Sequence, residues 1–254
     1  YKTRTRQADR MMKNLIKIAV LCLSPVLAMA SGGGDEGLDP VDIDLADKAS
    51  LQRGAKTFVN YCLSCHSAAY MRYERMGTDL GINEQLLREN LMLATEKPGD
   101  TMTVTMSEDG AKKWFGVVPP DLSLTARSKS PKWIYTYLRS FYWDESSGTG
   151  WNNTLVPNVA MPHVLYRLQG YREAKFEGTA GGIRHFAGYV EKTPGQMSNK
   201  EYDAAVRDLT NFMVYLAEPA KLVRYKIGIW VMIFMGILII LTYATKKEYW
   251  RDVH

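Results

Sequence analysis

Apolar residues recur at helical spacing in two long stretches of the chain. In SNKEYDAAVRDLTNFMVYLAE, residues 198–218, Ser198 and Glu201 form the pattern of a capping box. One face of this stretch collects the apolar side chains of Tyr202, Ala205, Leu209, Phe212, Met213 and Leu216. In SLQRGAKTFVNYC, residues 50–62, the apolar face follows Ser50 and consists of Leu51, Ala55, Phe58, Val59 and Cys62. Both stretches therefore predict amphipathic helices.

Shorter helices are predicted over residues 83–94, 107–115 and 130–143, because each of these stretches begins with a residue that caps helices well. The caps are Asn83, Ser107 and Ser130, and Pro131 takes the first helical position of the third helix. Residues 166–192 are rich in glycine and predict either a loop or a loose hairpin. Short helices joined by long loops predict an all-α fold.

The C-terminal part of the chain contains 17 uncharged residues in succession, 227–243, which are rich in Ile, Leu and Met. Since Leu222 and Val223 extend this run, we expect one transmembrane helix over residues 222–245 rather than a buried core helix. Basic residues follow it: Lys246, Lys247 and Arg251. Positive charge marks the cytoplasmic side, so residues 246–254 are predicted to form a cytoplasmic tail.

The N-terminal segment has the pattern of a secretory leader. Residues 11–30, MMKNLIKIAVLCLSPVLAMA, place two lysines before an apolar run and end in a small-x-small triplet. We expect a signal peptide cleaved after Ala30, with residues 1–10 as an upstream extension. Together with the C-terminal helix, this predicts a single-pass protein of the bacterial inner membrane whose domain, residues 31–221, lies in the periplasm.

The distribution of charge along the chain shows one local feature, a group of acidic residues near the start of the predicted domain. Residues 1–30 hold six basic residues and one acidic residue, so the net charge of +5 belongs to the leader and gives no reason to expect nucleic-acid binding. Residues 34–48 carry a group of acidic side chains, the acidic arm: Asp35, Glu36, Asp39, Asp42, Asp44 and Asp47. We expect a solvated arm; the alternative is a surface that attracts a basic redox partner.

The motif with the most specific chemistry is CLSCH, in which Cys62 and Cys65 precede His66. A zinc site would need two more ligands at the usual spacing, and the other histidines, His163, His185 and His254, are scattered. A thioredoxin-like dithiol would follow a strand, whereas a helix is expected before Cys62. The pattern favours covalent attachment of one haem c, with the thiols on its vinyl groups and His66 on the iron.

A second axial ligand decides between an electron carrier and a haem enzyme. Met161 is our candidate, because it precedes Pro162 in an irregular segment, LVPNVAMPHV, that can press a thioether against a haem. His163 is the main competitor, and Met197 is less free beside a helix cap. With both axial positions filled, the iron has no place to bind oxygen or peroxide, so the reaction is one-electron relay.

Four motifs in this order also carry a family resemblance. YCLSCHSAAYMRY, VVPPDLSLTARS, NVAMPHVLY and MSNKEYDAAVRDLTNFMVYLAEPA, followed by one membrane helix, resemble the cytochrome c1 family over residues 38–250. The resemblance implies an all-α cytochrome c-like domain with long loops, and it implies axial ligation by His66 and Met161. It also implies that Arg127 meets a haem propionate and that Pro119 and Pro120 line the haem pocket.

The same resemblance implies partners. Members of the family belong to the cytochrome bc1 complex, with cytochrome b and a Rieske iron-sulfur subunit, and pass electrons to a soluble or anchored cytochrome c. The chain would then be no complete enzyme by itself. Two alternatives remain: a free-standing anchored shuttle that feeds a terminal oxidase, and an anchored haem enzyme such as a peroxidase that uses His163 or His185.

Overall fold

A computed structural model describes residues 37–104, 106–178 and 185–252 of the chain. The predicted leader with Cys22 lies outside the described residues, as do two acids of the acidic arm, Asp35 and Glu36. Apart from Gly37, the described residues belong to one structural unit, Leu38–His254.

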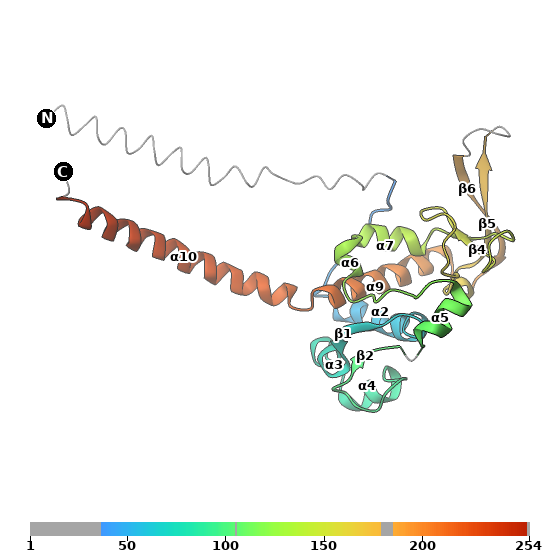
Figure 1. Ribbon diagram of the computed structural model, residues 1–254, viewed down its shortest axis with the longest axis horizontal. Coiled ribbons are helices and arrows are strands. Elements are labelled where there is room, and N and C mark those ends of the chain that lie inside the picture. The colour runs from blue at the N-terminus through green and yellow to red at the C-terminus, as the bar shows by residue number, and fades with distance from the viewer. Residues whose placement is uncertain (1–36, 105, 179–184, 253–254) are drawn as a thin grey trace. The chain divides into compact units, whose positions relative to one another are not determined.

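Two long helices form the centre of the fold. Helix α2 (Lys48–Tyr61) packs against α9 (Asn199–Ala217), as Figure 1 shows. The capping box of α9 is confirmed, since Ser198 and Glu201 exchange both hydrogen bonds. Helix α2 begins two residues before the predicted stretch: its cap is Asp47, which accepts the hydrogen bond from the Ser50 N–H, and Ser50 lies inside the helix.

The shorter helices surround this pair. They are α3 (Tyr73–Leu80), α4 (Glu84–Asn90), α5 (Glu108–Phe115), α6 (Thr125–Ser128), α7 (Pro131–Leu138) and α8 (Tyr166–Gln169). The caps Asn83, Ser107 and Ser130 are confirmed. Helix α4 ends four residues before the predicted Ala94, and α7 ends at Leu138 because the chain then enters a strand.

The all-α expectation is only partly right: about 48% of the residues are helical and 15% lie in strands. The described strands form three antiparallel pairs. The strands are β1 (Ala68–Arg72) with β2 (Thr101–Met102), β3 (Phe141–Trp143) with β4 (Trp151–Asn153), and β5 (Gly170–Glu177) with β6 (His185–Pro194). For residues 166–192 the sequence predicted either a loop or a loose hairpin, and the β5–β6 pair shows that a hairpin forms. Most of its side chains are exposed, so no alternation of buried and exposed residues marks it in the sequence.

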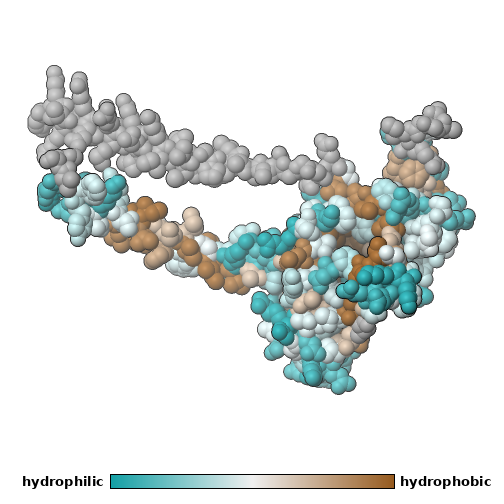
Figure 2. Space-filling view, viewed as in Figure 1, coloured by the Kyte–Doolittle hydropathy of each residue, from teal (hydrophilic) through white to brown (hydrophobic). Residues whose placement is uncertain are grey.

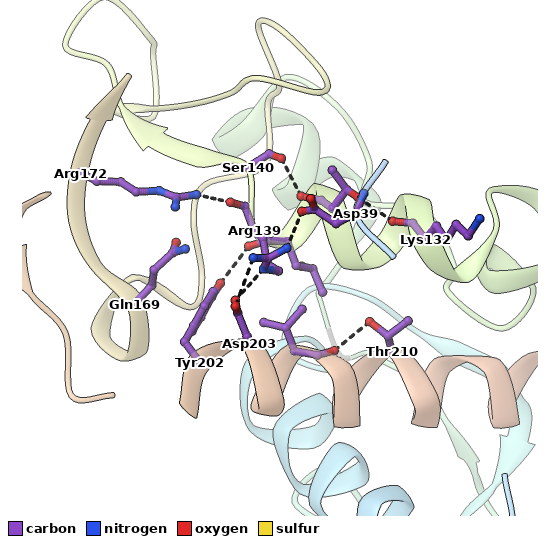
Figure 3. A network of polar contacts seen from close by, with 12 residues as sticks. Asp39, Lys132, Arg139, Ser140, Gln169, Arg172, Tyr202, Asp203 and Thr210 are labelled. Carbon is purple, nitrogen blue, oxygen red and sulfur yellow. Dashed lines mark hydrogen bonds and ion pairs between the residues drawn. The ribbon is translucent and has the colours of Figure 1, made fainter. Parts of the chain in front are cut away.

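An ion-pair network ties the start of the domain to α7 and α9. The guanidinium of Arg139 pairs with Asp203 at 2.6 Å and also with Asp39 (Figure 3). Arg172 of β5 donates to the carbonyl oxygens of Arg139 and Phe141, so the hairpin is held by the same segment (Figure 3). Tyr202 completes the group with a bond of 2.8 Å to the Leu138 carbonyl.

Helix α10 (Lys221–Tyr249) is long and apolar enough to cross a membrane, and it is the one such helix among the residues described. Its most apolar part has a mean hydropathy of 2.4, and no side chain of that part is buried. Figure 2 shows this brown middle of α10 with hydrophilic residues at its C-terminal end. By length and composition, α10 is therefore a candidate membrane anchor.

Candidate haem site

The C-terminus of α2 places the cysteine motif. Cys62 caps the helix, with its N–H bonded to the Phe58 carbonyl, and the chain then forms a tight turn. The N–H groups of Cys65 and His66 both donate to the Cys62 carbonyl, at 3.0 and 2.8 Å. The motif is thus one compact turn directly after a buried helix, the arrangement expected for haem attachment and not for a strand-borne dithiol.

The protonation chemistry of Cys62 also disfavours a redox dithiol. Burial, with a smaller contribution from Cys65, raises the pKa of the Cys62 thiol to about 12. A reactive dithiol needs the opposite, a thiolate stabilised at neutral pH. Within the described residues, no three side chains of His, Cys, Asp or Glu lie together as a group that could hold a metal ion.

The imidazole of His66 is held by its neighbour in the proline motif. Its Nδ1 lies 2.8 Å from the carbonyl oxygen of Pro120, which fixes Nδ1 as the protonated nitrogen and leaves the Nε2 lone pair for a metal. Burial lowers the pKa of His66, and this outweighs the Pro120 bond and the charge of Asp121, which raise it. The ring is therefore neutral, as a ligand must be.

A largely apolar cavity of about 770 Å³ opens next to this turn. Cys62, His66, Pro120 and Met161 line it, together with side chains of α6, α7 and α9. A smaller adjoining cavity of about 90 Å³ is lined by Cys65 and Pro119, and again by His66, Pro120 and Met161. Six of the seven residues predicted from the sequence therefore meet at one site.

Arg127 is the predicted residue that the structure does not bring to this site. It is exposed on α6, and neither cavity is lined by it. Thr125, Ser128 and Lys129 line the large cavity instead, because positions i, i+3 and i+4 share one face of a helical turn. Lys129 is thus a cation at the site that the sequence reasoning missed, and the helical spacing from Thr125 was the signal for it.

The competitors of Met161 lie elsewhere. His163 is buried among aromatic rings, stacked on Phe141 at 5.0 Å, and its Nε2 is 2.7 Å from Gln169 Oε1. Among the described residues that line the two cavities, neither His163 nor Met197 occurs. Met213 of α9 does line the large cavity, but Met161 lines both. The geometry favours Met161 as the second ligand.

The structure does not support the alternative of an anchored haem enzyme, for which His163 and His185 were the candidate acid or base. His163 is turned into the aromatic cluster, and burial lowers its pKa to about 3, so the ring is uncharged near neutral pH and cannot act as an imidazolium acid. His185 is exposed at the start of strand β6 and lines neither cavity. Neither residue is placed as a distal acid or base.

The described acids of the acidic arm are mostly engaged in local structure. Asp39 pairs with Arg139, Asp44 accepts from the Ala46 N–H at 2.8 Å, and Asp47 caps α2. Asp42 is exposed. The arm is therefore a folded entry to the domain and not only a solvated leader, and attraction of a basic partner stays a prediction.

Comparison with known proteins identifies the family. The sequence profile of the Cytochrome C1 family matches residues 43–253. The chain is 53% identical over 245 residues to a cytochrome c1 of Allochromatium vinosum, covering 96% of this chain and all of that protein. It is 48% identical, with the same coverage, to a protein of Nitrosomonas europaea named ammonia monooxygenase gamma subunit. A cytochrome c1 of Blastochloris viridis is 25% identical over 96% of both chains.

The chain belongs to the cytochrome c1 family. Members of this family carry one covalently bound haem c and are membrane-bound, electron-transferring haem subunits of the bc1 complex. The complex implies cytochrome b and a Rieske iron-sulfur protein as partner subunits.

The site fits this group on its own geometry. The large cavity is apolar and falls within the range of roughly 300–1,000 Å³ usual for cofactor sites. This cavity and the smaller one beside it are lined by both thiols of the attachment pair, by the imidazole of His66, whose Nδ1 is held by Pro120, and by the thioether of Met161. Those are the donors that a covalently attached, six-coordinate haem c requires.

Proposed function

We propose that this cytochrome c1 chain relays single electrons from the Rieske subunit to a soluble or anchored cytochrome c within the bc1 complex. The observation that supports the proposal is the joint position of Cys62, Cys65, His66 and Met161 around one apolar space. The haem c supplies an iron that changes by one electron between its ferric and ferrous states.

The chain's own side chains set what that iron does. The two thiols would hold the group covalently, and the Nε2 of His66 and the Sδ of Met161 would be its iron donors. The Pro120 carbonyl fixes the His66 tautomer, and Pro119 and Pro120 form the wall beside it. With both donors bound, no coordination position would be left for oxygen or peroxide, so these residues favour outer-sphere electron relay over catalysis at the iron.

Lys129, and not Arg127, is the cation that would lie near the haem carboxylates. Lys129 lines the large cavity and its ammonium lies 5.5 Å from the Trp133 ring centre. A cation there lowers the cost of burying a carboxylate and favours the reduced iron electrostatically.

The orientation in the membrane belongs to the same proposal. Residues 31–221 form a periplasmic haem domain after cleavage behind Ala30, residues 222–245 span the membrane, and residues 246–254 are cytoplasmic. The support is the apolar α10, with Lys246 and Lys247 in its last turn.

The proposal is tested by purifying the complex from native membranes in mild detergent through a tag on this chain. We expect b-type haem, an iron-sulfur signal and quinol-driven reduction of cytochrome c to co-purify in fixed ratio. If the chain emerges alone or with a terminal oxidase, the haem assignment stands but the function is that of an anchored shuttle.

A matched variant links this activity to the haem of this chain. Cys62→Ala combined with Cys65→Ala removes both attachment thiols, and we expect loss of the covalent haem and of cytochrome c reduction. If b-type haem is retained and cytochrome c reduction continues at the normal rate, the haem of this chain is not on the electron path.

A further inference from the structure

Met161 lies within an irregular segment, residues 154–165, that joins β4 to α8. The loop that leads to Met161, residues 154–161, has no regular secondary structure of its own. Strand β4 ends at Asn153, and the backbone from there to Met161 includes Asn158 in the left-handed region, with φ +60°. A loop without regular hydrogen bonding relies on side chains to hold it in place. The position of the Met161 sulfur therefore depends on what fixes the two ends of this loop.

Asn153 fixes the first end. It is 1% exposed, and its Oδ1 accepts from the N–H groups of Leu155 and Val156, at 2.9 and 3.1 Å. Its Nδ2 donates to the backbone carbonyl of Tyr137 on α7, at 2.9 Å. One buried amide thus joins the start of the loop to a residue of α7 that lines the cavity.

Tyr137 also fixes the second end. Its hydroxyl lies 3.4 Å from the Sδ of Met161 and donates to it. The ring that carries this hydroxyl is itself confined, stacked on Trp133 at 4.8 Å and edge-on to Phe141 at 5.1 Å. The carbonyl and the hydroxyl of one residue therefore hold the two ends of the loop.

We propose that Tyr137 and Asn153 are positioning residues that hold Met161 against the iron and tune its donor strength. The inference rests on the proposed role of Met161 as axial ligand. A thioether sulfur has two lone pairs, so it can bind a metal with one while it accepts the Tyr137 hydroxyl with the other. A hydrogen bond on the sulfur draws electron density from it, weakens its donation to ferric iron and so favours the reduced state.

Tyr137→Phe is the first test, because it removes the hydroxyl and keeps the ring stack. We expect a lower reduction potential, corresponding to a change of about fivefold in the preference for the ferric over the ferrous state, the factor of one net hydrogen bond. Tyr135→Phe is the matched control, since Tyr135 lies on the same helix but does not line the cavity and packs beside Arg139. Equal reduction potentials in the two variants overturn the role of Tyr137.

Asn153→Asp is the second test. It keeps an acceptor for Leu155 and Val156 but removes the donor to the Tyr137 carbonyl, so the loop loses its link to α7. We expect easier displacement of Met161 by cyanide, again about fivefold. Asn90→Asp is the control, because its amide also donates to a helix carbonyl, that of Leu86 at 3.0 Å, but at an exposed site. Identical cyanide affinities in the two Asp variants contradict the link.

Met161→Leu separates this inference from the proposed function. If Met161→Leu keeps the methionine-to-iron charge-transfer band, Met161 is not the ligand, and both proposals fail together. If Met161→Leu loses the band while Tyr137→Phe and Asn153→Asp match their controls, the ligand assignment stands and only the positioning role is wrong.

Discussion

The backbone carbonyl oxygen of Asp208 occupies the space that a side chain on Gly54 would need. A Cβ atom built on Gly54 would lie 2.1 Å from this oxygen and 2.7 Å from the Cβ of Phe212. Asp208 belongs to α9 and Gly54 belongs to α2. The absence of a side chain at Gly54 therefore allows the two helices to pack closely. A hydrogen bond also joins the two helices at this contact, because the Ser50 hydroxyl donates to the Asp208 carboxylate at 2.7 Å.

Gly54→Ala is therefore expected to destabilise the domain. The backbone oxygen cannot move aside as a flexible side chain would, and overpacking of a core typically costs about 1–3 kcal/mol. Thermal or urea unfolding of the haem-loaded protein measures the loss. Gly148→Ala is the control, because nothing lies within 4 Å of its Cβ position, and its stability should stay near that of the unmodified protein. Equal stability of the two variants would show that α2 and α9 can move apart to accommodate the added methyl group at no cost in stability.

Lys129 and Arg127 make a matched pair for electrostatics. Lys129 lines the cavity and Arg127 does not. Removing a cation near the haem disfavours the reduced iron, so Lys129→Gln should lower the reduction potential more than Arg127→Gln. Potentiometric titration of both variants decides the order. A larger drop in Arg127→Gln would restore the family-based assignment.

The capping box of α9 predicts a pH dependence of stability. The backbone N–H and the hydroxyl of Ser198 both donate to the Glu201 carboxylate at 2.8 Å and hold the pKa of that carboxyl below its ordinary value. The unfolded chain then binds more protons than the folded one around pH 4, so stability rises with pH through this window. At pH 7 the unmodified protein should be more stable than Glu201→Gln, and the gap should close as the pH falls below about 4.

Urea unfolding at several pH values measures this gap. Glu191→Gln, on the exposed strand β6, is the control and should show no comparable change. If the difference in unfolding free energy between Glu201→Gln and the unmodified protein is the same at all pH values, the charge of the Glu201 carboxylate contributes nothing to stability.

Asp47→Ala tests whether the acidic arm is structural. Asp47 caps α2, the helix that ends in the cysteine motif, and loss of such a cap costs about 1 kcal/mol. Asp42→Ala, at an exposed position of the same arm, should leave unfolding unchanged. The reverse order in a urea titration would remove the structural role of Asp47.

Local patterns in the sequence were sufficient for much of this molecule. The caps at Asn83, Ser107 and Ser130, the capping box of α9 and the apolar run of α10 each depend on residues within one or two helical turns. The attachment motif is equally local, because Cys62, Cys65 and His66 form a single turn. Such features are readable without knowing what packs against them.

Contacts between residues far apart in the chain could not be predicted from the sequence. The apolar face after Ser50 predicted a helix from residue 50, but the hydroxyl of Ser50 bonds to Asp208, 158 residues away, and the helix starts earlier with Asp47 as its cap. The β5–β6 hairpin is exposed and carries no clear alternation. The contact of Tyr137 with Met161 joins α7 to a loop 24 residues away, and no spacing rule foretells it. These features depend on tertiary packing, which overrides local preference.

We propose that electrons reach this haem from the Rieske subunit and leave it to a cytochrome c. Stopped flow on the purified complex tests this path by following the absorbance of the c-type haem, with and without the Rieske subunit, after mixing with quinol and then with oxidised cytochrome c. We expect rapid reduction only when the Rieske subunit is present. Once the haem is reduced chemically, we expect rapid reoxidation by cytochrome c in both preparations. Reduction by quinol at the same rate without the Rieske subunit, or a reduced haem that passes no electron to cytochrome c, would contradict this proposal.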